Sequence, residues 1–432
     1  MRVQTKDFFI PSTDLKLDGL FSVRDYVDTY FSKSISSPHR IVRFVVTNSD
    51  ETGYHCEIDL MLREEGDPMP PGDVFSFKKR EYENTNAFTA VLLIPTGIGA
   101  EIGGHCGDGN ATARLIAAAC DTLITHPNVV NASDINEMTE STLYVEGSVI
   151  TRLFLGTVGL QKTRSNRILM LMDSHEEKYF NNEIINAVSA ARATIGLSCD
   201  VYEMKDMARL TSQYSTSGRA VGEIAGIEKI FSVIERFKDN YDAIGLSTLI
   251  DVPEHFHKTY FAGDTMVNPW GGVEAMLTHS IAEIFNIPCA HSPMMPGSEV
   301  KNLDHGIVDP RKASETSSTA YLHSILKGLH RSPRIVAPDK GITLEHISCL
   351  VIPDGCIGVP TLACLENDIP VIAVKENKNN MRNDLRKLPF KKDKLFIVES
   401  YLEAAGVMAA LKAGVSIDSL KRPISYTTVL EK

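Results

Sequence analysis

The residues of this sequence that are best suited to chemistry lie in a glycine-rich loop at residues 95–110. Its six glycines allow a ligand to approach the backbone closely, and amide groups at the start of the helix expected after it could hold an anion. His105 and Asp108 could transfer protons or ligate a metal, and we predict that both are catalytic. Six further residues are predicted to bind the ligand: Thr96, Gly97, Gly99, Glu101, Gly103 and Gly104. The alternative is that the glycines only form tight turns. Cys106 is a weaker candidate because the sequence shows no paired base.

A second polar cluster follows an apolar segment, at residues 125–138. Ser133 and Asp134 fit the N-cap of a helix, which explains part of this polarity. The other polar side chains need another reason, and we predict that they bind a polar ligand. These residues, with one carboxylate from the next segment, are His126, Asn128, Asn131 and Glu146.

Later loops supply the remaining candidates. His291 ends an apolar segment and His305 lies beside Asp304 in the polar loop that follows it, and both are predicted to be catalytic because imidazole is the commonest acid–base group near neutral pH. Residues 304–312 suit a carboxylate or phosphate ligand, although a solvated turn fits equally well. A helix expected from residue 313 begins with several hydroxyl groups, which would also favour an anion. The predicted binding residues of these loops are Asn268, Trp270, Arg311, Asp354 and Gly355.

No cofactor motif accompanies these residues. The glycine spacing matches neither the dinucleotide fingerprint nor a P-loop. His255 and His257 form a His-x-His pair in an expected loop, but no third ligand follows at a recognised spacing, so surface histidines explain the pair better. The cofactor is therefore unknown, and a metal is possible but unsupported by ligand spacing. Trp270 either walls a pocket or fills a gap in the core.

The segments that must position these residues repeat one order: an apolar strand, a polar loop, an amphipathic helix and another apolar strand. Strands are predicted at residues 90–95, 121–125, 167–173, 199–202, 241–250, 287–291, 348–353 and 369–374, and helices at 111–119, 183–195, 272–285 and 359–366. Strands that are apolar throughout are buried on both faces, as in parallel sheets covered by helices. We predict an α/β fold of doubly wound, mostly parallel sheets built from Rossmann-like units. Ligands of such sheets bind beyond the carboxyl ends of the strands.

The first part of the chain has a different pattern. Residues 40–46 and 55–62 predict a β-hairpin, and the Pro- and Gly-rich residues 64–73 predict an exposed connection. We predict three domains: a small N-terminal α+β domain at residues 1–85, a main α/β domain with the glycine-rich loop at 86–330, and a C-terminal Rossmann-like α/β unit at 331–432.

Composition narrows the classes of partner. The 44 Lys and Arg against 55 Asp and Glu give a formal net charge of -11, which argues against nucleic acid and anionic membranes. The sequence shows no apolar core of a signal peptide and no segment apolar enough to span a membrane. We therefore expect a cytoplasmic protein with reduced thiols, a small-molecule anionic ligand, no nucleic-acid or membrane partner, and a possible homo-oligomer.

Several long motifs resemble a family of cyanobacterial, plastid and other bacterial proteins that is known as a domain of unknown function. They are LIPTGIGAEIGGH at residues 93–105, THPNVVNASDIN at 125–136, LYVEGS at 143–148, NPWGGVE at 268–274, KGLHR at 327–331 and IPDG at 352–355. The resemblance spans roughly residues 88–380 and implies no reaction. Small residues usually occupy the positions of Cys106 and Cys356 in that family, which argues against either thiol as a nucleophile. Residues 351–374 also resemble the nucleotide-binding corner of B-type glycosyltransferases.

Three functional hypotheses follow. The leading one is a cytosolic enzyme, of transferase, lyase or isomerase type, that acts on a small phosphorylated or carboxylated metabolite with His and Asp as acid–base groups. The second is a transferase that depends on a nucleotide or sugar nucleotide. The third is a non-catalytic sensor that binds a small molecule.

Overall fold

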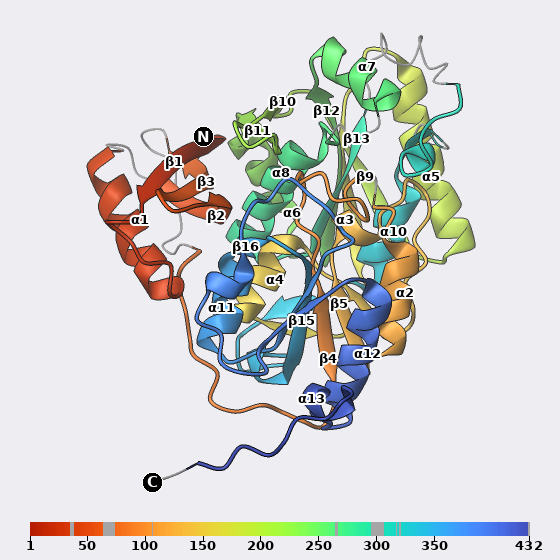
Figure 1. Ribbon diagram of the computed structural model, residues 1–432. Helices are drawn as coiled ribbons and strands as arrows, with labels where there is room; N and C mark the ends of the chain where they lie inside the picture. The colour runs from red at the N-terminus through yellow and green to blue at the C-terminus, as the bar shows by residue number, and fades with distance from the viewer. Residues whose placement is uncertain are drawn as a thin grey trace.

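The computed structural model describes residues 1–34, 39–63, 74–105, 107–263, 267–294, 306–316, 318 and 321–430. Within these residues the chain is a mixed α/β protein with two large sheets and helices packed around them (Figure 1). His305, Cys106 and the predicted connection at residues 64–73 lie outside the described residues.

The first large sheet has six strands, and all of its neighbouring pairs are parallel. Its strands are β4 (Thr89–Leu92), β5 (Thr122–Thr125), β6 (Thr142–Tyr144), β15 (Ile347–Pro353), β17 (Val371–Val374) and β18 (Leu395–Val398). They are arranged in the order β18-β17-β15-β4-β5-β6, so the chain runs outward in opposite directions from the central pair β4 and β15. Helix α2 (Asn110–Ala118) connects β4 to β5, and α11 (Val359–Glu366) connects β15 to β17. Strands β4, β5 and β17 are buried along their whole length, as expected for strands covered on both faces.

The second large sheet joins the N-terminal segment to the middle of the chain. Its order is β16 (Ile357–Gly358), β2 (His39–Ser49), β3 (Gly53–Leu62), β1 (Arg2–Pro11), β11 (Ala220–Ala225), β10 (Arg209–Tyr214), β12 (Ala243–Asp251), β8 (Arg167–Asp173) and β9 (Ser198–Met204), with β13 (Cys289–Met294) also paired to β12. The pairs among β8, β9, β12 and β13 are parallel. The pair β2 and β3 is antiparallel, which confirms the predicted hairpin.

The remaining elements cover these sheets or connect them. The helices are α1 (Leu20–Ser34), α3 (Pro127–Val130), α4 (Gly147–Phe154), α5 (Lys178–Thr194), α6 (Glu228–Phe237), α7 (Glu254–Ala262), α8 (Gly271–Phe285), α10 (His323–Arg331), α12 (Tyr401–Lys412) and α13 (Ile417–Leu420). A short antiparallel pair is formed by β7 (Gly159–Gln161) and β14 (Arg334–Val336), and 3₁₀ turns occupy η1 (Ala313–Thr316), η2 (Leu344–His346) and η3 (Leu385–Lys387).

The predicted alternation of strands and helices is confirmed for every strand and helix proposed in the α/β part of the chain up to residue 294 and again from residue 347. The predicted domain boundaries stay a prediction, but both sheets combine strands from either side of them. Strand β1 pairs with β11, and β16 pairs with β2, so residues before 85 share a sheet with later ones (Figure 1). Likewise, β15 pairs with β4.

Three local predictions are wrong. No helix follows Ser133, whose backbone is left-handed (φ 52°) in a turn, and Asp134 instead accepts a hydrogen bond from the amide of His323 (2.9 Å) at the start of α10. His255 and His257 lie on helix α7 rather than in a loop, and the buried His257 packs against Trp270. In the described part of residues 313–320, the predicted helix is only the 3₁₀ turn η1.

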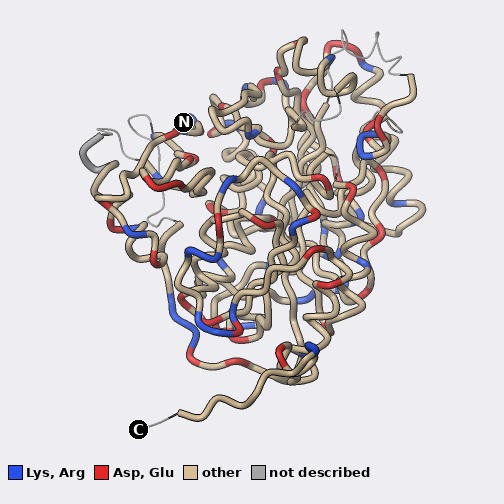
Figure 2. The backbone as a smooth tube through the Cα atoms, in the orientation of Figure 1, with Lys and Arg blue, Asp and Glu red and all other residues tan. Residues whose placement is uncertain are grey.

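Charged residues are mixed on the outside of the molecule. Figure 2 shows positions of Lys and Arg interspersed with positions of Asp and Glu along the chain. Among the described residues, no helix is both long and apolar enough to cross a membrane. The cysteines that the structure describes are all free and buried.

Candidate functional site

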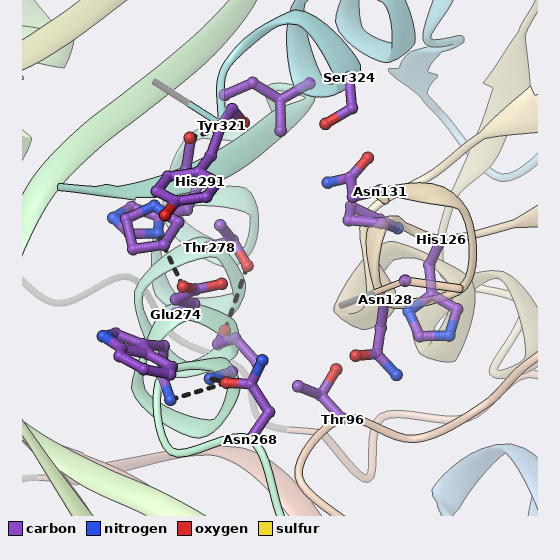
Figure 3. Close-up of a pocket in the computed structure, with 18 of the residues that line it drawn as sticks. Thr96, His126, Asn128, Asn131, Asn268, Glu274, Thr278, His291, Tyr321 and Ser324 are labelled. Carbon is purple, nitrogen blue, oxygen red and sulfur yellow. Dashed lines mark hydrogen bonds and ion pairs between the residues drawn. The ribbon is translucent and has the colours of Figure 1, made fainter. Parts of the chain in front are cut away.

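A cavity of about 130 Å³ lies where strands β4, β5 and β6 end. One wall comes from the residues that follow these strands, and the opposite wall comes from α8 and β13, with α10 above (Figure 3). We call it the central cavity. Its polar lining comprises Thr96, His105, His126, Asn128, Asn131, Ser133, Glu146, Asn268, Glu274, Thr278, His279, His291, Ser292, Glu315, Tyr321 and Ser324.

The wall from the six-stranded sheet is held together by amide side chains. Asn128 donates two hydrogen bonds of 2.8 Å, to the carbonyls of Ile94 and Gly103, which hold the glycine-rich loop against α3. His126 accepts from the amide of Ile94 (3.1 Å), and burial together with the neighbouring His279 lowers its pKa to about 3. His126 is therefore neutral at physiological pH, and both residues combine a structural role with a place in the cavity wall (Figure 3).

Glu146 joins the two walls. Its carboxylate caps the N-terminus of α4 by accepting from the amide of Ser148 (2.8 Å). The other oxygen, Oε1, accepts from the hydroxyl of Thr278 (3.2 Å) and lies 3.2 Å from Nε2 of His279. A carboxylate that holds one imidazole nitrogen orients the ring and leaves the other nitrogen for chemistry, as in base–orienter pairs of hydrolytic enzymes. Nδ1 of His279 has no hydrogen-bond partner in the described part of the chain.

Asn268 organises the start of helix α8. Its side-chain oxygen accepts from the amides of Trp270 (2.9 Å) and Gly271 (3.2 Å), while its nitrogen donates to Glu315 (2.6 Å) and to the carbonyl of His105. Asn268 therefore ties the glycine-rich loop, α8 and η1 together at one point of the cavity.

Trp270 contributes a buried ring behind this junction. The ring packs against His257 and Tyr260 of helix α7. Both interpretations of this tryptophan therefore have a structural basis, since the residue lines the cavity and also fills the core beneath it.

Glu315 and Glu274 place two carboxyl groups in the same wall. Desolvation of the Glu315 carboxyl and the nearby charge of Glu274 raise the pKa of Glu315 to about 8. Glu315 therefore carries a proton at neutral pH, whereas a solvent-exposed glutamate would not.

His291, on strand β13, lies next to Glu274 of helix α8. Its Nδ1 is 3.7 Å from Glu274 Oε1, which is too long for a hydrogen bond (Figure 3). Its Nε2 is 2.8 Å from the hydroxyl of Thr248. The carboxyl of Asp173 at the end of β8 lies behind this pair, and burial raises its pKa to about 6. Thr248 therefore holds Nε2 of the imidazole, and Nδ1 lies on the side of the ring nearer Glu274, which also lines the cavity.

Several buried polar atoms around the central cavity have no hydrogen-bond partner among the described residues. They are Nδ1 of His105, His279 and His291 and the hydroxyl oxygens of Ser133 and Ser324. Buried polar groups in folded proteins are nearly always paired, so these atoms leave hydrogen bonds that water or a ligand would have to complete. His105 is neutral at physiological pH, because burial and the charges of Arg311 and Lys312 lower its pKa to about 4.

The structure brings together many of the predicted site residues. Those that line the central cavity are His105, His291, Thr96, His126, Asn128, Asn131, Glu146, Asn268 and Trp270. Asn131 is fixed by the hydroxyl of Tyr144, which donates to its oxygen (2.9 Å).

Other predicted residues lie in the loop but not in the cavity lining. Asp108 accepts from the amide of Gly103 (2.7 Å), and burial raises its pKa to about 6. Gly97 has a left-handed backbone (φ 78°), and a side chain there would meet the carbonyl of Ala220 at 2.5 Å. A side chain at position 104 would clash with the carbonyl of Ala100. Gly99 and Gly103 likewise have positive φ, so these glycines form the close turns that the alternative interpretation described.

Three more predicted residues are also placed away from the central cavity. Arg311 forms ion pairs with Asp309 (2.6 Å) and with Glu101 (2.5 Å), so its charge is already neutralised. Asp354 and Gly355 form the turn after β15, where the Asp354 carboxylate accepts from the amide of Gly355 (3.0 Å). His305 lies outside the described residues.

Sequence reasoning missed the cavity residues that lie opposite the glycine-rich loop: Glu274, Thr278, His279, Glu315, Tyr321 and Ser324. Ser133, on the same side as Asn131, was assigned to a helix N-cap but lines the cavity. Glu274 ends the NPWGGVE motif, and that was a signal for it. Thr278 and His279 carry no such signal, because their spacing is only that of a helix. Within the described residues, no group of His, Cys, Asp and Glu is arranged to hold a metal ion.

Comparison with known proteins places the chain in a family. A family model described as "Protein of unknown function (DUF3326)" matches residues 89–421. An uncharacterized lipoprotein of Synechococcus sp. is 34% identical over 364 residues, which cover 79% of this chain and 96% of that protein. No solved structure matches. The matched residues include both walls of the central cavity and the motifs quoted above, and the chain belongs to the DUF3326 family of proteins of unknown function.

Proposed function

We propose that the protein is an enzyme that acts on a small phosphorylated or carboxylated metabolite and moves protons with the carboxyl and imidazole groups of the central cavity. The observation that carries this proposal is the pair Glu274 and Glu315. One of two neighbouring carboxyl groups is kept protonated at neutral pH, and unpaired imidazole nitrogens lie in the same cavity. Pairs of titratable groups whose pKa values are pushed apart are typical of acid–base catalysis.

The roles follow from the protonation states. Glu315 is the proton donor, since its pKa of about 8 lies close to the working pH. Glu274 and Nδ1 of His291, 3.7 Å apart, form the side that accepts a proton. His279, oriented by Glu146, is a second base at the other end of the cavity. Lyase and isomerase reactions need a proton to be removed at one atom and delivered at another, and group transfer needs one to be removed from the acceptor.

The proposed ligand remains anionic, but the central cavity supplies no cation for it. Among the described residues that line this cavity there is no Lys or Arg. Neutral donors such as Asn131 and Thr96 suit the polar part of a metabolite. The anionic group needs a neighbouring site.

Strand order favours the doubly wound, Rossmann-like form of the fold. Numbered along the chain, the six parallel strands have the order 3-2-1-4-5-6, which is that of dinucleotide-binding sheets. This observation also supports the second candidate, a transferase that depends on a nucleotide or sugar nucleotide. A glycosyl or nucleotidyl donor would then raise the melting temperature and be consumed only with an acceptor.

The cellular location is also a proposal. We expect the protein in the cytoplasm, whereas the Synechococcus relative is named a lipoprotein. Fractionation of cells that produce the full chain tests this directly, and a protein found in the membrane fraction would contradict the expectation. Light scattering of the purified chain tests for a homo-oligomer.

Deuterium exchange tests proton transfer without a known substrate. The protein is incubated in D₂O with a mixture of phosphorylated and carboxylated metabolites, and mass spectrometry detects new C–D bonds or new products. We expect exchange with the wild type and its loss in Glu274→Gln and Glu315→Gln. Glu140→Gln is the matched control, since Glu140 is exposed, lies outside the cavity lining and forms a surface ion pair with Arg331. A metabolite that raises the melting temperature but is neither exchanged nor converted would instead favour the non-catalytic sensor.

A further inference from the structure

A second cavity, of about 110 Å³, adjoins the central one. The two share Thr96, His126, Gly147, Ala275 and His279 as lining residues, so a single ligand could extend through both. We call it the side cavity. Its own lining is mostly apolar and comes from β2, the loop after β4 and the start of α11, as in Val45, Ile98 and Val359. An apolar cavity beside a polar one suits a ligand with an apolar body.

The side cavity lies at the position where sheets of this topology bind ligands. Leu93 to Ile98 follow β4, and Cys356 to Thr361 follow β15, and both segments line it. These two strands are the neighbours from which the six-stranded sheet runs outward in opposite directions. Connections that leave toward opposite sides open a crevice between them, and ligands of open parallel sheets bind in that crevice.

Helix α11 points its N-terminus at this cavity. Gly358 is the N-cap residue, and no side chain caps the helix or places an acid in its first turn. Gly358, Val359 and Thr361 line the cavity. The uncapped amide groups of a helix N-terminus and its dipole attract an anion. At α4 and α8, by contrast, Glu146 and Asn268 already occupy the first amides.

Arg219 supplies an independent indication at the same cavity. The residue is almost completely buried and lines the side cavity, and its Nε donates to Glu57 (2.7 Å). Its Nη2 is buried and has no hydrogen-bond partner within the described part of the chain. A buried guanidinium N–H without an acceptor is costly, so an acceptor from a ligand would complete it. Because Glu57 balances the charge of Arg219, the site offers donors rather than excess positive charge.

We propose that the side cavity binds the anionic end and the apolar body of a small amphipathic carboxylate or phosphate, with the anion held by the N-terminus of α11 and Nη2 of Arg219. This inference rests on the proposed function, since it supplies the anion site that the central cavity lacks. The ligand's reacting part would then extend past His279 toward Glu274 and Glu315.

Matched pairs of probes test this proposal. Phenyl phosphate is compared with phenol, and hexanoate with hexanol, by isothermal titration calorimetry on the full chain at pH 7. We expect at least one anion to bind tenfold or more tightly than its neutral twin. Which anion binds more tightly distinguishes a phosphate from a carboxylate ligand.

Two variants locate the binding. Thr151 lines the side cavity only, so Thr151→Leu should fill it and weaken the anion at least tenfold, while Thr151→Ser should bind like the wild type. Arg219→Met with Glu57→Gln removes both charges together, so that neither is left buried alone. The double variant should bind the neutral probe with the affinity of the wild type, but should no longer bind the anion more tightly than its neutral twin.

Several results would overturn the proposal. They are equal affinities for an anion and its neutral twin, no binding of either anion, or an affinity that Thr151→Leu leaves unchanged. Failure of the proposed function gives a different result. In that case phenyl phosphate or hexanoate would still bind with the expected preference, and no metabolite would exchange deuterium in a way that depends on Glu274 or Glu315.

Discussion

Two clusters of carboxylates in this molecule, one fully buried and one half-buried in a cavity wall, differ in how their charges are balanced. In the first, Asp59 forms two hydrogen bonds with Arg43 (2.6 and 2.7 Å), and Glu57 pairs with Arg219 (2.7 Å) and accepts from two serine hydroxyls. In the second, Glu274 and Glu315 lie together with no Lys or Arg among the described residues of the cavity lining. We call them the balanced cluster and the cavity cluster.

The two clusters respond to burial in opposite ways. Burial on its own would raise the pKa of Glu57 and Asp59, but Arg219, Arg43 and the hydroxyl donors outweigh it and lower both values. In the cavity cluster, burial and the like charge of Glu274 outweigh the hydrogen bond from Asn268 and the cation Lys312, and they raise the pKa of Glu315 to about 8. A balanced cluster stabilises a fold around fixed charges, whereas an unbalanced one keeps a proton available.

Removing one member of the balanced cluster should have the largest effect on stability. Arg219→Met leaves Glu57 buried without its cation, and we expect a loss of about 3–5 kcal/mol in the free energy of unfolding. Urea denaturation measures it. Arg219→Met with Glu57→Gln should recover most of the loss. A single variant as stable as the wild type would show that this cluster is not held by charge balance.

Neutralising the cavity cluster should instead act on chemistry. Glu315→Gln keeps an acceptor for Asn268 but cannot give up a proton, so we expect deuterium exchange to fall by about a hundredfold or more. Below pH 4.5, where the wild-type carboxyl is protonated in both the folded and the unfolded chain, the melting temperature should stay close to that of the wild type. At neutral pH the variant should be the more stable protein, because it does not need to take up a proton on folding. A large loss of stability with unchanged exchange per folded molecule would reverse the comparison.

The cavity cluster should also make stability depend on pH. The folded-state pKa of Glu315, about 8, lies above its ordinary value of 4.5, so the fold binds this proton more tightly than the unfolded chain does. The resulting stability is fully present below pH 4.5 and is lost as the pH rises through 8. Relative to Glu315→Gln, the wild type should therefore lose up to about 1.4 kcal/mol per pH unit across that window. Parallel curves for the two proteins would contradict a raised pKa.

The smallest effect compares a hydroxyl group of the balanced cluster with one in the lining of the central cavity. Ser215 donates to Glu57 (2.6 Å), so Ser215→Ala should cost about 1.5–3 kcal/mol, the range for a hydrogen bond to a charged group. Ser324 lines the central cavity, and its hydroxyl has no partner among the described residues, so Ser324→Ala should change stability by less than about 0.5 kcal/mol. Thermal unfolding of both variants measures the difference. Equal losses would mean that Ser324 is bonded in the fold.

Local patterns in the sequence predicted one wall of the site well. The motif at residues 125–136 follows a strand that is apolar throughout, and the rule that ligands lie beyond strand ends pointed to His126, Asn128 and Asn131. The glycine-rich loop was predicted less well. Gly103 and Gly104 were expected to hold an anion, but they pack closely against other segments of this protein. A glycine needed for close packing and a glycine needed for anion binding look the same in the sequence.

The second wall could not be predicted in this way. Glu274 and His279 lie on α8, where polar residues are equally compatible with an outward helix face. They become site residues only because α8 crosses the ends of strands formed more than 100 residues earlier. Glu315 could not be predicted from local sequence either, because its raised pKa depends on desolvation and on Glu274, which comes close only in the folded chain.

The sequence by itself determined the α/β class and the alternation of apolar strands with helices, although not helix α7 or the turn at Ala313–Thr316. Hydrophobic periodicity and turn residues suffice for this because they act over a few neighbouring positions. The sequence also determined the family, through motifs long enough to be specific. Only the tertiary structure decided which carboxylates are balanced by arginines and which are not. That difference depends on the distances between residues far apart in the chain, and through those distances on burial and charge.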